Sequence, residues 1–118
     1  MGISVYVDGS GGPNGGYGYF VKETGESFYE KKPEITNNQA EYMAIISALN
    51  KYMHSNEDVT IYSDSKNTVN QLNHEFAINN EQLRTLAREA WGIIGKFSNL
   101  SIKWVPRNEN LAGKMLGS

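Results

Sequence analysis

Residues 3–12 read ISVYVDGSGG. The first five are β-branched or aromatic apart from one serine, which is typical of a β-strand, and the run stops at an aspartate and a glycine-rich turn. Residues 17–22 and 27–30 have the same strand-like character, and turn residues separate them from their neighbours. The first 30 residues therefore predict an antiparallel meander of three strands.

The middle of the chain predicts a long helix and then a fourth strand. Thr36 and Gln39 have the spacing of a capping box, in which each side chain satisfies a free backbone N–H at the helix start. Small and apolar residues recur at helical intervals from there to about residue 53. Residues 59–63 read VTIYS, a compact β-branched run that predicts a strand.

The last part of the chain predicts a short helix over residues 65–72, a longer one over 81–97 and a fifth strand over 101–105. Residues 109–116 can begin a final helix. Helices between the later strands imply parallel crossovers. The expected fold class is therefore α/β, a five-stranded mixed sheet flanked by helices, and the length fits one domain over residues 1–118.

The composition excludes several classes of protein. The chain has no cysteine, which excludes disulfides, thiolate catalysis and cysteine-type zinc sites. Eleven Lys and Arg against 13 Asp and Glu give a net charge of −2, which excludes a strongly basic nucleic-acid binder but not a local basic patch. The sequence has no long apolar run and no signal-peptide pattern, so we expect a cytoplasmic monomer with no membrane contact.

Three acids lie where solvation does not readily explain them. Asp8 directly follows the first predicted strand and Asp64 the fourth, so both carboxylates emerge at one sheet edge if these strands are parallel neighbours about 4.8 Å apart. Glu41 lies on an otherwise apolar line of the long helix and is expected to point inward. Singly, each acid could be a turn residue or a helix N-terminal acid. Together they predict a carboxylate cluster that binds a hard divalent cation.

The segments that contain these acids resemble the three acidic motifs of type 1 ribonuclease H. They are residues 5–10 (VYVDGS), 36–41 (TNNQAE) and 61–65 (IYSDS). Residues 104–110 (WVPRNEN) resemble the strand and loop before the last motif of that family. The four segments occur in the family's order and span nearly the whole chain, so the resemblance implies a ribonuclease H-like fold.

The resemblance also implies an activity, which is metal-dependent cleavage of the RNA strand of RNA–DNA hybrids. Asp8, Glu41 and Asp64 match metal-binding catalytic residues, with Mg²⁺ as the cofactor and Mn²⁺ as a plausible substitute because it also prefers oxygen ligands. Contacts to the minor groove of the hybrid, where the 2′-hydroxyl distinguishes RNA from DNA, are implied beside the glutamate. The residues expected to bind substrate are Gly9, Ser10, Asn38, Gln39, Ser65, Arg107 and Asn110.

The chain departs from the family at its last motif. Asn110 matches, but Lys114 stands where a metal-binding aspartate is expected four positions later. A lysine there should repel a second metal ion. Three explanations stay open: a natural variant that works with three carboxylates, a weakened or inactive hybrid-binding module, or an altered or truncated C-terminus. Glu109 is a candidate substitute ligand.

The chain also lacks the family's basic helical insertion, because residues 73–80 carry no lysine or arginine. Binding of a hybrid must then depend on other positive residues, and fewer phosphate contacts predict weak affinity with a shallow salt dependence. A nuclease of the same fold that acts on DNA is a third hypothesis, which fold alone does not exclude. The candidate positive residues are Lys66, Arg84, Arg88 and Arg107.

Overall fold

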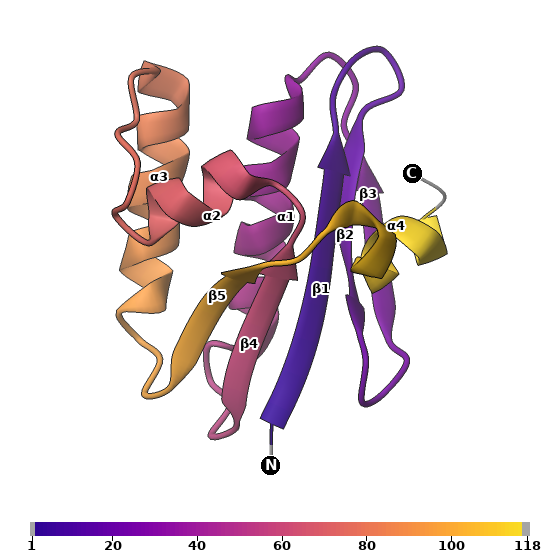
Figure 1. Cartoon of the computed structure of the whole chain (residues 1–118), viewed down its shortest axis with the longest axis vertical. Coiled ribbons are helices and arrows are strands. Elements are labelled where there is room, and N and C mark those ends of the chain that lie inside the picture. Colours follow the sequence, from indigo (N-terminus) through magenta and orange to yellow (C-terminus); the bar gives the residue numbers. More distant parts are fainter. Residues whose placement is uncertain (1, 117–118) are drawn as a thin grey trace.

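The computed structural model describes residues 2–116, which form one five-stranded mixed sheet with helices against it (Figure 1). The strands are β1 (Gly2–Ser10), β2 (Gly16–Val21), β3 (Ser27–Lys31), β4 (Asp58–Ser63) and β5 (Leu100–Trp104). The helices are α1 (Asn37–Tyr52), α2 (Lys66–Leu72), α3 (Glu81–Ile94), α4 (Leu111–Leu116) and the 3-10 turn η1 (Arg107–Glu109).

The strand order in the sheet is β3-β2-β1-β4-β5. β1 pairs in antiparallel fashion with β2, and β2 with β3, whereas β1, β4 and β5 run parallel. The predicted meander and parallel crossovers are thus confirmed, and with them the α/β fold class. The parallel strands place the carboxyl ends of β1 and β4 side by side, which is where ligands bind in open α/β sheets.

Helix α1 is fixed at its start and along its buried face. The predicted capping box is present: the Thr36 hydroxyl accepts from the Gln39 N–H at 3.0 Å, and the Gln39 side chain accepts from the Thr36 N–H at 2.9 Å. Tyr42, Ile45 and Leu49 are fully buried, and α1 packs against β1, β2 and α3. Figure 1 shows α1 behind the sheet and α4 in front of it.

Several element boundaries differ from the sequence prediction. β5 is shifted by one residue toward the N-terminus, and the final helix begins at Leu111 rather than at residue 109, because the 3-10 turn η1 comes first. β1 continues to Ser10, so Asp8 lies inside the strand opposite Gly18 of β2 rather than in a turn after it. The reason is that β2 begins at Gly16, early enough to pair with the residues that the glycine run assigns to a turn. α3 ends at Ile94, three residues before the predicted end, because Gly95 caps it and glycine is a poor helix former.

The glycine-rich segment between β1 and β2 is a hairpin connection, because the two strands it joins are antiparallel neighbours. Gly12 has a φ of +94°, a conformation that favours glycine. Among the helices in residues 2–116, none combines the length and apolar character that a membrane crossing requires.

Candidate active site

Three carboxylates from three separate elements meet at the carboxyl end of the central strands. Asp8 comes from β1, Glu41 from α1, and Asp64 from the residue directly after β4. One carboxylate oxygen of each lies within 4.8 Å of those of the other two. Asp8 and Glu41 are buried, and Asp64 is half-buried. The structure therefore brings together the three acids that the sequence analysis singled out.

The register of the sheet accounts for the pairing of the two aspartates. Val7 of β1 lies opposite Ser63 of β4 in the parallel ladder. Asp8 directly follows Val7, and Asp64 directly follows Ser63. The two aspartates therefore lie side by side just beyond the last pair of the parallel ladder. No loop conformation is needed to bring them together, because parallel pairing alone fixes their separation.

A glycine accounts for the approach of Glu41. A Cβ built on Gly9 would lie 2.4 Å from the carbonyl carbon of Ala40 and 2.8 Å from the Glu41 nitrogen. Only a glycine therefore lets β1 pass this close to the backbone of α1. The Gly9 N–H also hydrogen-bonds the Glu41 carboxylate. Gly9 thus sets the distance between strand and helix that makes Asp8 and Glu41 neighbours.

A second tie between the same segments was not predicted from the sequence. The Gly11 N–H donates to the Asn37 side-chain oxygen at 2.6 Å, and the Gly12 N–H donates to the Ile35 carbonyl at 2.8 Å. These bonds hold the end of β1 against the start of α1. The sequence did not single out Asn37, because its hydrogen-bond partner Gly11 lies 26 residues earlier in the chain and no local pattern connects the two.

The Glu41 carboxyl has the most strongly perturbed electrostatics of the three acids. Burial raises its pKa to about 9, and the nearby charges of Asp8 and Asp64 contribute in the same direction. The Gly9 N–H and the positive charge of Arg107 oppose the shift. A carboxyl in this environment is protonated at neutral pH unless a further positive charge joins the site.

The donor set fits a divalent cation. Glu41 Oε1 is buried and accepts no hydrogen bond from any described residue. Such an oxygen costs free energy unless a partner satisfies it, and a hard cation takes carboxylate oxygens from several residues at once. Asp8, Glu41 and Asp64 are the residues that could hold such an ion, because their oxygens already converge.

Asn110 connects the cluster to α4 through hydrogen bonds. Its side-chain NH₂ donates to the Val7 carbonyl at 2.8 Å and to the Asp64 carboxylate at 3.1 Å. Its side-chain oxygen accepts from the Ala112 N–H at 3.0 Å, which caps α4. The residue is fully buried. These bonds tie Asn110 to Asp64, and the substrate contact predicted for Asn110 from the sequence stays a prediction.

The remaining predicted substrate-binding residues occupy different parts of this end of the molecule. Gly9 is half-buried and Ser10 exposed at the end of β1. The Gln39 side chain is engaged with Thr36 and, at 2.9 Å, with Gln82. Ser65 caps α2, and its hydroxyl bonds the Thr68 hydroxyl at 2.8 Å. Asn38, in the first turn of α1, and Arg107, in η1, are both exposed.

The two residues singled out at the family's last motif, where the chain departs from it, are both exposed. Lys114 lies in α4 with an exposed side chain, and Glu109 lies in η1 and is also exposed. The Lys114 N–H donates to the Asn110 carbonyl at 3.3 Å, one helical turn earlier. Arg107 contributes a positive charge that lowers the pKa of the Glu41 carboxyl. The role of position 114 stays a prediction.

The chain is similar to known proteins over most of its length. Residues 23–117 match the model of the reverse transcriptase-like family. A curated protein of Enterococcus faecalis named "Putative hydrolase EbsB" is 29% identical, over 97% of this chain and 90% of that protein. The structure is similar to ribonuclease H1 from the halophilic archaeon Halobacterium salinarum NRC-1, with a TM-score of 0.87, 27% identity and coverage of 98% of this chain and 94% of that one.

A third relative shows the same fold at lower identity. LC11-RNase H1, solved in complex with an RNA/DNA hybrid, has a TM-score of 0.84 at 24% identity, covering 97% of this chain and 92% of that one. The two solved structures share the five-stranded sheet and its flanking helices with this chain. The acidic cluster thus lies at the carboxyl ends of the strands of a ribonuclease H-like fold.

Proposed function

This chain belongs to the reverse transcriptase-like family and has a ribonuclease H-like fold, and from this premise we propose that it is an endonuclease that hydrolyses the RNA strand of RNA–DNA hybrids. Asp8, Glu41 and Asp64 are the catalytic residues in this proposal. They hold divalent ions, Mg²⁺ by preference and Mn²⁺ as a substitute. Residues 1–118 act as one domain.

The observation that carries the proposal is the buried Glu41 carboxylate. One of its oxygens has no donor in the described part of the chain, and two aspartates lie beside it. Three acids this close destabilise a metal-free fold, so a purely structural role does not account for them. Ions bound there supply activation of the attacking water and stabilisation of the leaving 3′ oxygen.

The protein's own groups have distinct tasks in this scheme. Asp8 and Glu41 are held by the close contact of Gly9 with α1, so their separation is fixed before any ion or substrate binds. Asn110 holds the Asp64 carboxylate and the Val7 carbonyl together, which orients Asp64 toward the cluster. Such second-layer hydrogen bonds keep metal-binding carboxylates in their productive orientation.

The proposed substrate is a hybrid duplex because of the residues around the cluster. Asn38 and Gln39 precede Glu41 on α1, and Gly9, Ser10, Ser65 and Arg107 border the same end of the sheet. We propose that these groups contact the hybrid, with the 2′-hydroxyl read in the minor groove. The complex of LC11-RNase H1 with an RNA/DNA hybrid supports this choice of partner.

A second candidate is a hybrid-binding module that cleaves weakly or not at all. The observation that favours it is Lys114, a positive residue one turn after Asn110 on α4. A positive charge near the acids reduces their capacity for a second ion. Binding of the duplex would survive, because phosphate contacts depend on other residues.

The test is hydrolysis of a hybrid labelled on its RNA strand, with Mg²⁺ and then with Mn²⁺. Asp64→Asn should lower cleavage by about a thousandfold or more, because a lost ligand removes several kcal/mol of transition-state stabilisation. The matched control is Asp58→Asn, at the opposite end of β4, where the carboxylate bonds the Asn99 amide at 2.8 Å. Cleavage that survives Asp64→Asn contradicts the assignment, and parent protein that binds the hybrid without cutting it selects the second candidate.

A further inference from the structure

Lys66 and Trp104 form a stacked pair directly beside the acidic cluster. The Lys66 ammonium lies 4.9 Å from the centroid of the Trp104 ring. The indole N–H of the same tryptophan donates to the Asp64 carbonyl at 3.2 Å. Trp104 is 43% exposed although it is a large apolar side chain, and Lys66 is exposed as well. The pair is therefore exposed to solvent and tied to the backbone of Asp64.

The stability of α2 does not explain a lysine at this position. Lys66 is the first residue of α2, where the positive end of the helix dipole disfavours a cation. It forms no salt bridge within residues 2–116. Stacking on an exposed ring contributes only about 0.5–1 kcal/mol. What the stack does provide is a fixed position for an otherwise flexible ammonium group.

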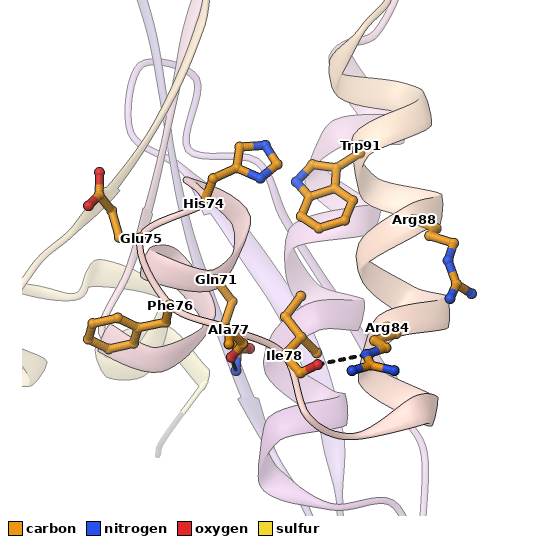
Figure 2. Close-up of a pocket in the computed structure, with 9 residues that line it drawn as sticks. All are labelled: Gln71, His74, Glu75, Phe76, Ala77, Ile78, Arg84, Arg88 and Trp91. Atoms are coloured by element: carbon orange, nitrogen blue, oxygen red, sulfur yellow. Dashed lines mark hydrogen bonds between the residues drawn. The ribbon is translucent and has the colours of Figure 1, made fainter.

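The other positive residues that the sequence singled out are placed differently. Arg84 and Arg88 line a pocket of about 430 Å³ between the segment after α2 and α3, and none of the three acids lines it (Figure 2). The Arg84 guanidinium is already bonded to the Ile78 carbonyl at 2.7 Å and to Glu81 at 2.9 Å. Lys66, by contrast, stands over the tryptophan that holds the backbone of Asp64.

We propose that Lys66, held on the Trp104 ring, binds a backbone phosphate of the nucleic-acid substrate next to the acidic cluster. The inference rests on the proposed function. An ammonium group contacts a phosphate as a point charge and carries no base information, so the contact contributes affinity and register for every sequence. Trp104 is a positioning residue, because it holds both the phosphate-binding ammonium and the Asp64 carbonyl. The pair supplies a positive contact that segment 73–80, which has no lysine or arginine, does not.

The experiment measures binding of a fluorescein-labelled hybrid to the full chain carrying Asp64→Asn, by anisotropy over a series of salt concentrations. Adding Lys66→Ala should weaken binding about five- to tenfold at about 0.1 M salt and reduce the slope of log K against log salt by about one, for hybrids of any sequence. The matched control is Lys22→Ala, an exposed lysine whose N–H bonds Ser4 near the start of β1, at the far end of the sheet. It should leave the slope unchanged.

Substitutions of Trp104 test the stack. Trp104→Phe keeps a ring under the ammonium, so the slope of log K against log salt should stay close to that of the reference. Trp104→Leu removes the ring and should lower this slope toward the value for Lys66→Ala. In the Lys66→Ala background, Trp104→Leu should cause no further loss of slope. A merely structural role would lower the melting temperature without changing the salt slope.

The outcomes separate this inference from the proposed function. If the parent chain cleaves the hybrid while Lys66→Ala and Lys22→Ala have the slope of the reference, the phosphate contact is wrong and the nuclease assignment stands. If Trp104→Leu keeps the full slope, the role of the ring is wrong. If the chain neither cleaves nor binds the hybrid, the proposed function itself fails.

Discussion

The acidic cluster has two unlike sides, one carried by β1, α1 and β4 and the other by α4. The first side is part of the core: Asp8 and Glu41 are buried, and adjacent strands and a close helix contact fix their separation. The second side consists of the six-residue helix α4 and the residue before it: Asn110 contributes a buried amide, and the helix carries an exposed lysine, Lys114. One side supplies charge, and the other supplies a hydrogen bond.

The difference shows which parts of the site depend on the fold. The positions of the three acids follow from strand pairing and backbone contact, so a change there alters the sheet as well as the site. On the α4 side, the helix packs on β1 and β2. Its hydrogen bonds to the acid side come from Asn110, the residue before the helix, which bonds Val7, Asp64 and the Ala112 N–H. Substitutions on the two sides should therefore differ in size and in kind.

Gly9→Ala should have the largest effect, because it acts on the rigid side. The new methyl group would lie 2.4 Å from the Ala40 carbonyl carbon, so strand and helix must separate. We expect the free energy of unfolding to fall by about 2 kcal/mol or more. Hybrid cleavage should fall by about a hundredfold, because Asp8 and Glu41 move apart. Denaturant titration and an initial-rate assay measure the two effects.

The control for Gly9 is another glycine of the same chain. A Cβ at Gly92 of α3 meets nothing within 4 Å, so Gly92→Ala should raise the free energy of unfolding by about 0.5–1 kcal/mol and leave cleavage unchanged. If both substitutions behave alike, the close contact at Gly9 does not hold the cluster.

Asn110→Ala should have an intermediate effect. It removes the donor to the Asp64 carboxylate and leaves the Val7 carbonyl without that bond, at a cost of about 1–3 kcal/mol in unfolding free energy. Metal affinity and cleavage should fall about tenfold, as for other residues that orient metal ligands. As a control, Asn99→Ala removes an exposed amide that bonds Asp58 at the opposite end of β4. It should change neither metal affinity nor cleavage. Full activity in Asn110→Ala would remove α4 from the site.

Lys114→Asp should have the smallest effect, and it should be a gain. Position 114 follows Asn110 by one turn, so a carboxylate there adds negative charge near Asp64. An exposed charge is worth up to about 1 kcal/mol, which corresponds to a two- to fivefold rise in cleavage and in metal affinity. Lys114→Ala separates loss of the positive charge from gain of a ligand. No change in either variant means that position 114 does not face the ions.

The parts of the fold that sequence could predict are those with local signals. The capping box of Thr36 and Gln39, the alternating strands and the order of elements are all readable from spacing. The convergence of Asp8, Glu41 and Asp64 followed once the first and fourth strands were taken as parallel neighbours. The register of the parallel ladder explains why Asp8 and Asp64 lie side by side, because each directly follows one residue of the Val7–Ser63 pair.

What the sequence could not give depends on contacts between distant residues. Asn110 reaches Val7 across 103 positions, and Asn37 reaches Gly11 across 26. Neither contact leaves a periodic or spacing signal. The continuation of β1 through Asp8 was missed for a different reason, because a glycine-rich run favours a turn unless a partner strand is known.

The central claim is that the buried Glu41 carboxyl exists to meet a divalent cation. Its pKa is raised to about 9 in the fold from an ordinary value of 4.5. The fold thus favours the protonated form, and the metal-free protein should lose stability as pH rises from about 4.5 toward 9. Glutamine is neutral at every pH, so Glu41→Gln lacks this loss.

The most direct measurement is thermal unfolding of the parent chain and of Glu41→Gln at about pH 7.5, in EDTA and in Mg²⁺. We predict that the variant melts several degrees higher in EDTA, while Mg²⁺ raises the melting temperature of the parent and has little effect on the variant. A parent that is the more stable in EDTA, or an equal rise with Mg²⁺ in both proteins, would contradict the account.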